Sequence, residues 1–433
     1  MNSTIMVFVL PYIGHITPMV PLLRYFGERG YAVRVYSTPS IAPYVEKAGA
    51  LLVSLDDLYD QMEGDASDHA INPLAMMDLL MLMDEQMEQE IRIHPPAFAL
   101  VDAATIWGRL LAEKYRIPMI LSSAPMIINR LTMKEYFRYF EQLMQILETG
   151  VMEEKLEEAA KAGFPKKEIY ALYTVEQEEN CIVYVSKELQ PCADQMQSYH
   201  IFYAGYVNDE KEGRDNSLED EVGLKAGGER DAAPQDTEHE RSSSRPLIYI
   251  SMGTSSINTG FFFKNCVTAF QNREELDIVM AVCSEEIVKQ LGDLPGHIRA
   301  YPYVDQKEIL KKADVVIFHG GLNTLRDSLV AGVPMIICPR AFDQEGNAKR
   351  VEELGAGIAL ANNRPETLWR AVRLMLSVPS YRENSFRMGE TLRKSGTVEE
   401  GIRWILSCIG TKDGKMPAEA GAEDCVEQAC SDR

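Results

Sequence analysis

The sequence predicts an α/β protein made of two doubly wound domains. Short apolar, β-branched runs alternate with helical stretches over the first two hundred residues, which is typical of a parallel sheet wrapped by helices. The same alternation resumes after a polar segment that ends near residue 245. The 433 residues also suit two domains of roughly 200 residues each better than a single core. We therefore expect a cleft between two domains.

The expected strands are the short apolar runs of the two halves. In the first half they are Ile5–Leu10, Ala32–Tyr36, Leu51–Leu55, Phe98–Val101, Met119–Ser122 and Cys181–Val185. In the second half they are Leu247–Ser251, Ile278–Val282, Ile298–Tyr301, Val315–Phe318 and Met335–Cys338. The first run has no basic flank and no small-residue cleavage site, so we interpret it as a strand and not a leader.

Two helical regions of the first half are longer than crossover helices need to be. They span residues 72–93 and about 131–162. The first is rich in Met and Leu at helical spacing, and it has two interpretations. Its methionines can line an apolar acceptor pocket, or they can pack in the core.

Composition sets the domain boundaries. We expect a first domain at 1–207, a flexible acidic linker at 208–245 and a second domain from 246. The linker is rich in Glu, Asp, Gly, Ser and Arg, and such segments bury too little surface to offset ordering entropy. A Gly-, Ala- and Glu-rich tail at 410–433 is expected to be disordered.

Charge and cysteine usage exclude several classes of function. Lys and Arg total 44 against 65 Asp and Glu, a net charge of −21, and no basic cluster offers a track for nucleic acid. No apolar run is long enough to span a bilayer. The eight cysteines are scattered, without the spacing of a metal site. We expect reduced thiols and a cytoplasmic protein that binds no nucleic acid and has no transmembrane segment.

The most informative segment, residues 318–347, begins where a predicted strand ends in a glycine turn. Gly320 and Gly321 let an anion approach the backbone, and the following helix offers unpaired N–H groups and a positive dipole end. Side-chain donors come from His319, Asn323 and Thr324. Asp327 shares the helix face of Asn323 and Thr324, where its carboxylate can accept ribose hydroxyls. The segment therefore predicts a site for a nucleotide diphosphate.

This segment resembles the donor-binding signature of the family 1 UDP-glycosyltransferases, and among these the bacterial macrolide and flavonoid glucosyltransferases. The matching residues are Tyr303, Gln306, His319, Gly321, Asn323, Thr324, Asp327, Asp343 and Gln344. Two positions depart from the family pattern. Asp327 stands where a glutamate is usual, and Asp305 stands where a proline is usual.

The resemblance implies a role for each residue of the second domain's site. Tyr303 would stack on the uracil, with the Val304 backbone at its edge. The diphosphate would bind His319, Asn323 and Thr324, and Thr254 would touch the β-phosphate from the loop after Ser251. Asp327 would bind the ribose. Asp343 and Gln344 would bind sugar hydroxyls.

The first domain carries the candidate base, His15, in the loop Leu10-Pro-Tyr-Ile-Gly-His-Ile-Thr-Pro18. Thr17 can cap the next helix and Pro18 suits its first position. The imidazole suits proton transfer near neutral pH, and its setting resembles that of the family's catalytic base. The resemblance pairs it with Asp102, which follows Phe98–Val101 and would orient the ring. Taken alone, Asp102 can also be a helix cap.

The resemblance implies two facing domains of the GT-B architecture, with donor bound at 246–378, acceptor at 1–207, and helices at 379–409 that return to the first domain. The expected reaction is inverting transfer of a sugar, with glucose preferred, from a UDP-sugar to a small lipophilic acceptor such as a macrolide or phenolic. No cofactor or metal is expected, because no Asp-x-Asp stands beside the phosphate loop. The alternatives are a nucleotide-sugar epimerase and a non-catalytic nucleotide-sugar binding protein.

Overall fold

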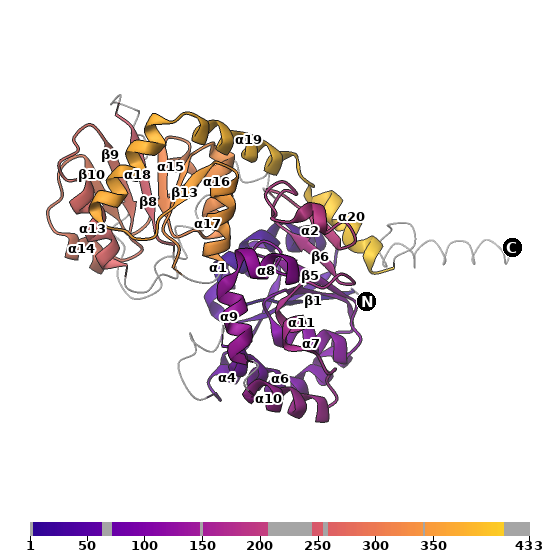
Figure 1. Cartoon of the computed structure of the whole chain (residues 1–433). Helices are drawn as coiled ribbons and strands as arrows, with labels where there is room; N and C mark the ends of the chain where they lie inside the picture. Colours follow the sequence, from indigo (N-terminus) through magenta and orange to yellow (C-terminus); the bar gives the residue numbers. More distant parts are fainter. Residues whose placement is uncertain are drawn as a thin grey trace. The chain divides into compact units, whose positions relative to one another are not determined.

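The computed structural model divides the chain into two compact units (Figure 1), and each is described by itself. Unit 1 comprises Met1–Asp209 and Ser395–Arg433, and unit 2 comprises Glu210–Lys394. The structure describes residues 3–62, 72–147, 150–206, 245–253, 259–340 and 343–410. The expected linker, from residue 208 to 244, lies outside the described residues, as do Thr254 and residues 411–433 of the expected tail.

Unit 1 is built on a seven-stranded sheet in the order β3-β2-β1-β4-β5-β6-β7. Its strands are β1 (Thr4–Phe8), β2 (Ala32–Ser37), β3 (Leu51–Ser54), β4 (Pro96–Asp102), β5 (Met119–Ser123), β6 (Asn180–Val183) and β7 (His200–Tyr203). All neighbouring strands pair in parallel. From β1 the chain adds β2 and β3 on one side of the sheet, and it then adds β4 to β7 on the other side. Strands β1 and β4 therefore flank the point where such sheets bind ligands.

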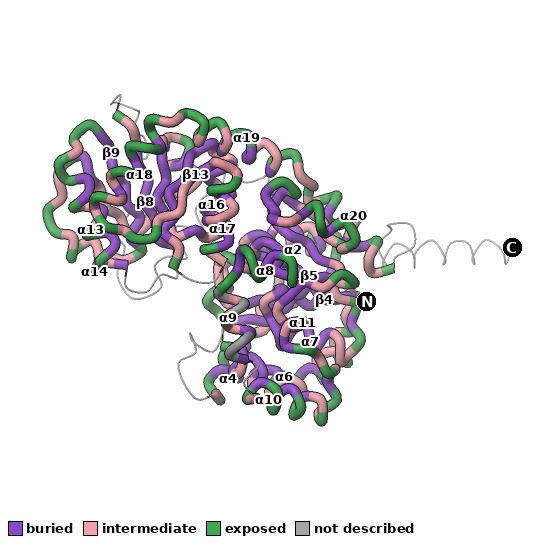
Figure 2. The backbone as a smooth tube through the Cα atoms, viewed as in Figure 1, coloured by how far each residue is buried: buried purple, intermediate pink, exposed green. Residues whose placement is uncertain are grey.

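Helices cover this sheet. They are α1 (Ile13–Ile16), α2 (Val20–Glu28), α3 (Ala42–Lys47), α4 (Asp56–Tyr59), α6 (Pro73–Ile93), α7 (Ile106–Lys114), α8 (Arg130–Tyr136), α9 (Arg138–Leu147), α10 (Val151–Lys161), α11 (Ile169–Tyr173) and α20 (Val398–Cys408). Every residue of β1 is buried, and Figure 2 shows buried backbone along the strands and exposed backbone on outer helix faces. Burial on both sides of the sheet explains its continuous apolar strands.

Unit 2 repeats the arrangement with a six-stranded sheet in the order β10-β9-β8-β11-β12-β13. The strands are β8 (Leu247–Ser251), β9 (Asp277–Ala281), β10 (Ile298–Tyr301), β11 (Val315–Phe318), β12 (Met335–Ile337) and β13 (Gly357–Ala359). The helices are α13 (Gly260–Phe270), α14 (Glu285–Leu291), α15 (Gln306–Leu310), α16 (Leu322–Ala331), α17 (Gln344–Glu353), α18 (Pro365–Ser377) and α19 (Ser380–Lys394). All its strand pairs are parallel. The order reverses between β8 and β11. The predicted class, two doubly wound α/β domains, is confirmed.

The expected helical region at 131–162 is three helices. Asn129 starts α8 with a capping box whose partner is Thr132. A further helix, α10, begins after Gly150, whose φ of 100° favours glycine. Four methionines of α6 are core residues: Met76, Met77, Met83 and Met87 are at most 4 % exposed, whereas Met81 is half-buried. Their side chains pack inside unit 1, which favours the packing interpretation.

The chain returns to unit 1 at Ser395, later than the expected boundary near Pro379. Helix α19 packs against α16, where Gly389 lies so close that an added Cβ would meet the Leu329 carbonyl oxygen at 2.1 Å. Helix α20 packs against α2. Of the helices expected to return at 379–409, α19 therefore belongs to unit 2 and α20 to unit 1.

No helix among the described residues is both long and apolar enough to cross a membrane.

Candidate active site

His15 lies in α1, the single helical turn that follows β1. The turn starts after Tyr12, whose backbone is extended, and the Thr17 hydroxyl donates to the Ile13 carbonyl at 2.7 Å. The expectation that Thr17 caps the next helix is therefore wrong, because its hydroxyl closes α1. The chain continues through a 3-10 turn into α2 and leaves it at Gly30, whose φ is 83°.

His15 contacts Asp102, the last residue of β4. The His15 Nδ1 lies 2.7 Å from the Asp102 Oδ2, with 22 % of the histidine side chain and none of the aspartate side chain exposed. Phe8 pairs with Val101 in the parallel register of β1 and β4. The two residues meet because Asp102 ends β4 and His15 lies in the first helical turn after the neighbouring strand β1, both at the carboxyl edge of the sheet.

Backbone groups hold the Asp102 carboxylate from both sides. The Leu10 N–H donates to Oδ2 at 3.2 Å, and the Ala104 N–H donates to Oδ1 at 3.1 Å. A buried carboxylate needs such donors to offset the loss of water. The Ala104 bond closes a local turn before α7. The N-cap of α7 is Thr105, so the alternative interpretation of Asp102 as a helix cap is wrong.

This contact sets the chemistry of the ring. An ionised carboxylate only accepts hydrogen bonds, so Nδ1 carries the proton that joins it to Asp102. In the neutral imidazole, Nε2 is then the unprotonated nitrogen. A histidine oriented in this way can accept a proton from a hydroxyl, and its carboxylate partner stabilises the imidazolium that forms.

In unit 2, the predicted glycine turn joins β11 to α16. Gly320 has a φ of 101°, and a Cβ there would meet the Ile337 side chain at 2.9 Å, so only glycine fits. Gly321 is the N-cap of α16, with no side-chain cap. The first N–H groups of a ten-residue helix therefore face the end of β11, an arrangement suited to anions.

The His319 ring lies between two glycines. A Cβ on Gly253 would meet the ring Cε1 at 2.5 Å, and one on Gly321 would meet Nε2 at 2.6 Å. Gly253 follows β8, the strand beside β11. Its contact with His319 is a feature that sequence reasoning missed. No side chain larger than hydrogen fits at either glycine without moving the imidazole.

Burial, and then the nearby charge of Arg340, lowers the pKa of His319 from 6.5 to about 4. The ring is therefore neutral near pH 7. As pH falls, the unfolded chain takes up this proton first, so the native state loses stability between pH 6.5 and about 4.

We expect this acid-dependent loss to be smaller in a His319→Gln variant. The measurement is urea unfolding of both proteins at pH 7.5 and pH 5. An equal change in the unfolding free energy for the two proteins between these pH values would show that His319 keeps an ordinary pKa in the native state.

Three predicted donor-site residues contact one another. The Thr324 hydroxyl donates to the Gln306 Oε1 at 3.0 Å, and the Gln306 Nε2 donates to the Asp327 Oδ2 at 2.7 Å. Gln306 begins α15, whereas the other two lie on α16. These two hydrogen bonds fix the orientation of the Gln306 amide and join the two helices.

Asp305, one of the two departures from the family pattern, has a local explanation. Its side chain caps α15 by accepting from the Glu308 N–H at 3.0 Å. Aspartate is a favoured N-cap residue. Tyr303 and Val304 lie partly buried between β10 and this helix, next to Gln306.

The Asp343-Gln344 pair lies at the start of α17. The Gln344 Oε1 accepts from the Arg340 N–H at 2.9 Å, and the Asp343 Oδ2 accepts from the Asn347 Nδ2 at 2.8 Å. The same Nδ2 donates to the Gly320 carbonyl at 2.8 Å. Asn347 therefore connects the Asp343-Gln344 loop with the glycine turn, a connection the sequence prediction did not include.

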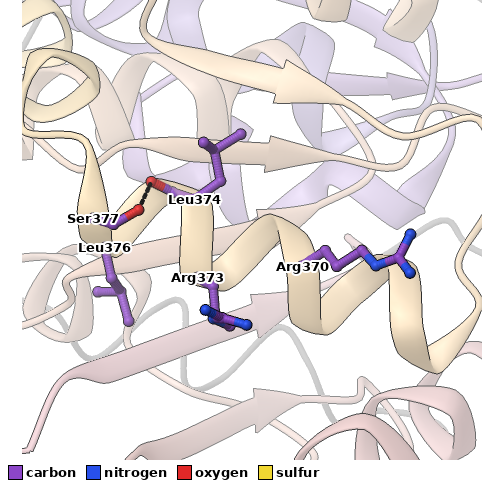
Figure 3. Close-up of a pocket in the computed structure, with 5 residues that line it drawn as sticks. All are labelled: Arg370, Arg373, Leu374, Leu376 and Ser377. Atoms are coloured by element: carbon purple, nitrogen blue, oxygen red, sulfur yellow. Dashed lines mark hydrogen bonds between the residues drawn. The ribbon is translucent and has the colours of Figure 1, made fainter.

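A surface pocket of unit 2 lies elsewhere. Figure 3 shows it over α18, lined by Arg370, Arg373, Leu374, Leu376 and Ser377. None of these is a predicted site residue. The structure holds no group of three or more His, Cys, Asp or Glu that could ligate a metal within the ranges it describes.

Comparison with known proteins assigns a chemistry to this arrangement. Residues 270–400 match the model of the erythromycin biosynthesis protein CIII-like C-terminal domain. The NDP-glycosyltransferase YjiC of Bacillus subtilis is 25 % identical over 92 % of this chain and 95 % of its own. The oleandomycin glycosyltransferase of Streptomyces antibioticus is 22 % identical over 80 % of this chain and 77 % of its own. The chain is a glycosyltransferase.

Solved structures agree on the fold. The kitacinnamycin glycotransferase has a TM-score of 0.75 at 23 % identity and covers 94 % of this chain and 99 % of its own. The calicheamicin glycosyltransferase CalG4 has a TM-score of 0.71 at 21 % identity and covers 95 % of this chain and 100 % of its own. The glycosyltransferase thus has the GT-B fold expected from the sequence, and its relatives are transferases of the natural-product type.

Proposed function

We propose that this glycosyltransferase moves glucose from UDP-glucose to a hydroxyl of a small lipophilic natural product, with inversion at the anomeric carbon. The observation that carries the proposal is the 2.7 Å contact between His15 Nδ1 and the buried Asp102 carboxylate. It provides an oriented base, which direct displacement at a sugar carbon requires.

His15 acts as the general base of this proposal. Its Nε2 takes the proton of the acceptor hydroxyl while that oxygen attacks the anomeric carbon. The bond between this carbon and the β-phosphate oxygen breaks, and UDP leaves with the electron pair. Asp102 keeps its charge and stabilises the imidazolium that forms. One displacement of this kind inverts the configuration.

The departing diphosphate is stabilised in unit 2. The N-terminal N–H groups of α16 provide positive potential, and the side chains of His319, Asn323 and Thr324 add hydrogen-bond donors at the same helix end. Thr254 contributes from the loop after β8, and Gly321 lets the phosphate approach. Uracil stacks on Tyr303 and meets the Val304 backbone. The ribose binds Asp327, next to Gln306, while Asp343 and Gln344 bind the sugar hydroxyls.

Relatives differ in donor, so the assay must compare donors. One structural neighbour is a spinosyn rhamnosyltransferase complexed with thymidine diphosphate, and another complex of it holds spinosyn aglycone. Our choice of UDP-glucose rests on Gln344, since glutamine at this place resembles glucose users.

The test is incubation with UDP-glucose or dTDP-glucose and a panel of macrolide, phenolic and sterol acceptors. We expect UDP release matched one to one by a β-glucoside, identified by mass and by its anomeric proton coupling. C2 or C4 epimers formed without acceptor would support the epimerase alternative instead. Preference for dTDP-glucose would correct the donor and leave the transferase intact.

We propose that no metal takes part, because helix α16 and its neighbouring donors supply the positive potential. Transfer by protein treated with EDTA is therefore expected to keep its rate within about twofold, since no bound cation stabilises the leaving group. A loss of rate that Mg²⁺ or Mn²⁺ restores would contradict this. Cytoplasmic action is supported by the six cysteines described, which are all free.

A further inference from the structure

Asn347 lies on the second turn of α17 and is completely buried, with 0 % of its surface exposed. Its Nδ2 makes two hydrogen bonds of 2.8 Å each, to the Gly320 carbonyl oxygen and to the Asp343 Oδ2. One amide group therefore links the glycine turn of the diphosphate site to a carboxylate of the sugar site.

The chemistry of these partners requires an amide at position 347. A carbonyl and a carboxylate oxygen both accept hydrogen bonds only, so the amide nitrogen must face them. An aspartate of the same shape would place a third acceptor there. The Asn347 Oδ1 is buried without a hydrogen-bond partner in the described ranges. An apolar side chain would avoid this cost, so packing alone does not explain the residue.

Asp343 has an unusual orientation for its position. It is the N-cap of α17, where aspartate commonly accepts from the helix N–H groups, yet it makes no side-chain cap hydrogen bond. Its Oδ2 binds Asn347 instead. The asparagine thus holds the carboxylate through the same amide group that binds the Gly320 carbonyl.

We propose that Asn347 is a positioning residue, which sets the Asp343 carboxylate for the donor sugar and ties its place to the diphosphate turn. This inference rests on the proposed sugar-binding role of Asp343. Asn347 touches no donor atom in this proposal. It acts by joining the Asp343 carboxylate and the glycine turn into one rigid element, so that the sugar and the diphosphate bind in a single geometry.

The test compares binding of UDP-glucose and of UDP, which lacks the sugar, by calorimetry without any acceptor. We expect Asn347→Ala to weaken UDP-glucose binding about tenfold, as loss of a charge-assisted hydrogen bond does, while UDP binding changes less than about threefold. In an Asp343→Ala background the same substitution should change UDP-glucose binding less than about twofold.

Two further variants keep the test sharp. Asn384→Ala is the matched control, because Asn384 also donates from Nδ2 to a glycine carbonyl, that of Gly355, at 3.0 Å, with no predicted site residue in contact. It should bind UDP-glucose normally. If Asn347→Ala does not fold, Asn347→Asp keeps the volume and reverses the hydrogen-bonding character, and the same loss is expected.

An equal effect of Asn347→Ala with and without Asp343, or equal losses for UDP and UDP-glucose, would overturn the positioning role. A different result would contradict the proposed sugar-binding role of Asp343. In that case Asp343→Ala alone would leave the affinity for UDP-glucose unchanged relative to the affinity for UDP.

Discussion

Replacing His15 with alanine is expected to lower kcat for glucose transfer by about 10²–10⁴-fold, the usual contribution of a general base. The dissociation constant of UDP should stay within about twofold, because the residues proposed to bind UDP belong to unit 2 and the substitution removes only proton transfer. Initial rates and calorimetry measure the two quantities.

His200→Ala is the matched control for this experiment. His200 is an exposed histidine of the same unit, at the start of β7, and its loss should leave kcat unchanged. Near-normal turnover by His15→Ala would show that another group takes the acceptor proton, and the proposed mechanism would fall.

Replacing Asp102 with asparagine should lower kcat by a similar factor, about 10²–10⁴-fold, and also destabilise unit 1. The carboxylate accepts from His15 Nδ1, the Leu10 N–H and the Ala104 N–H. An asparagine must turn its NH₂ group towards at least one of these donors. A buried donor left without an acceptor costs about 1–3 kcal/mol. If the NH₂ faces His15, the imidazole changes tautomer and Nε2 no longer accepts a proton.

Thermal unfolding and steady-state kinetics separate the two effects of Asp102→Asn. Asp84→Asn is a suitable control, because it weakens a partly buried ion pair with Lys114 in the same unit and touches no proposed site residue. It should lower stability without a matching fall in kcat. A fall in stability alone for Asp102→Asn would leave Asp102 with a structural role only.

Much of the fold followed from the sequence because its buried strands are continuous apolar runs. Strands β8 and β11 begin and end at the predicted residues. Two edge strands, β7 and β13, were missed. Strand β13 has three residues, Gly357–Ala359, too few for a periodic pattern, and β7 is mostly half-exposed or exposed. Their pairing depends on the rest of the sheet, and local propensity alone gives little signal.

The candidate site was predictable where a local motif carries it. The glycine turn, Asp327 and the Asp343-Gln344 pair all lie in one segment. The contact of Gly253 with His319 joins segments far apart in the chain, so no local pattern indicates it. Asn347 did leave a signal: it lies four residues after Asp343, a spacing that places two side chains on one helix face.

Helix α20 has a consequence for engineering this glycosyltransferase. Ile402, Ile405 and Leu406 of α20 belong to the same core cluster as β1 and α2, and Trp404 stacks on Phe202 with ring centroids 5.7 Å apart. The core of unit 1 cannot therefore be transplanted by exchanging the first two hundred residues alone. A working chimera has to carry its own residues 395–410 with the N-terminal half, as a matched pair of fragments at opposite ends of the gene.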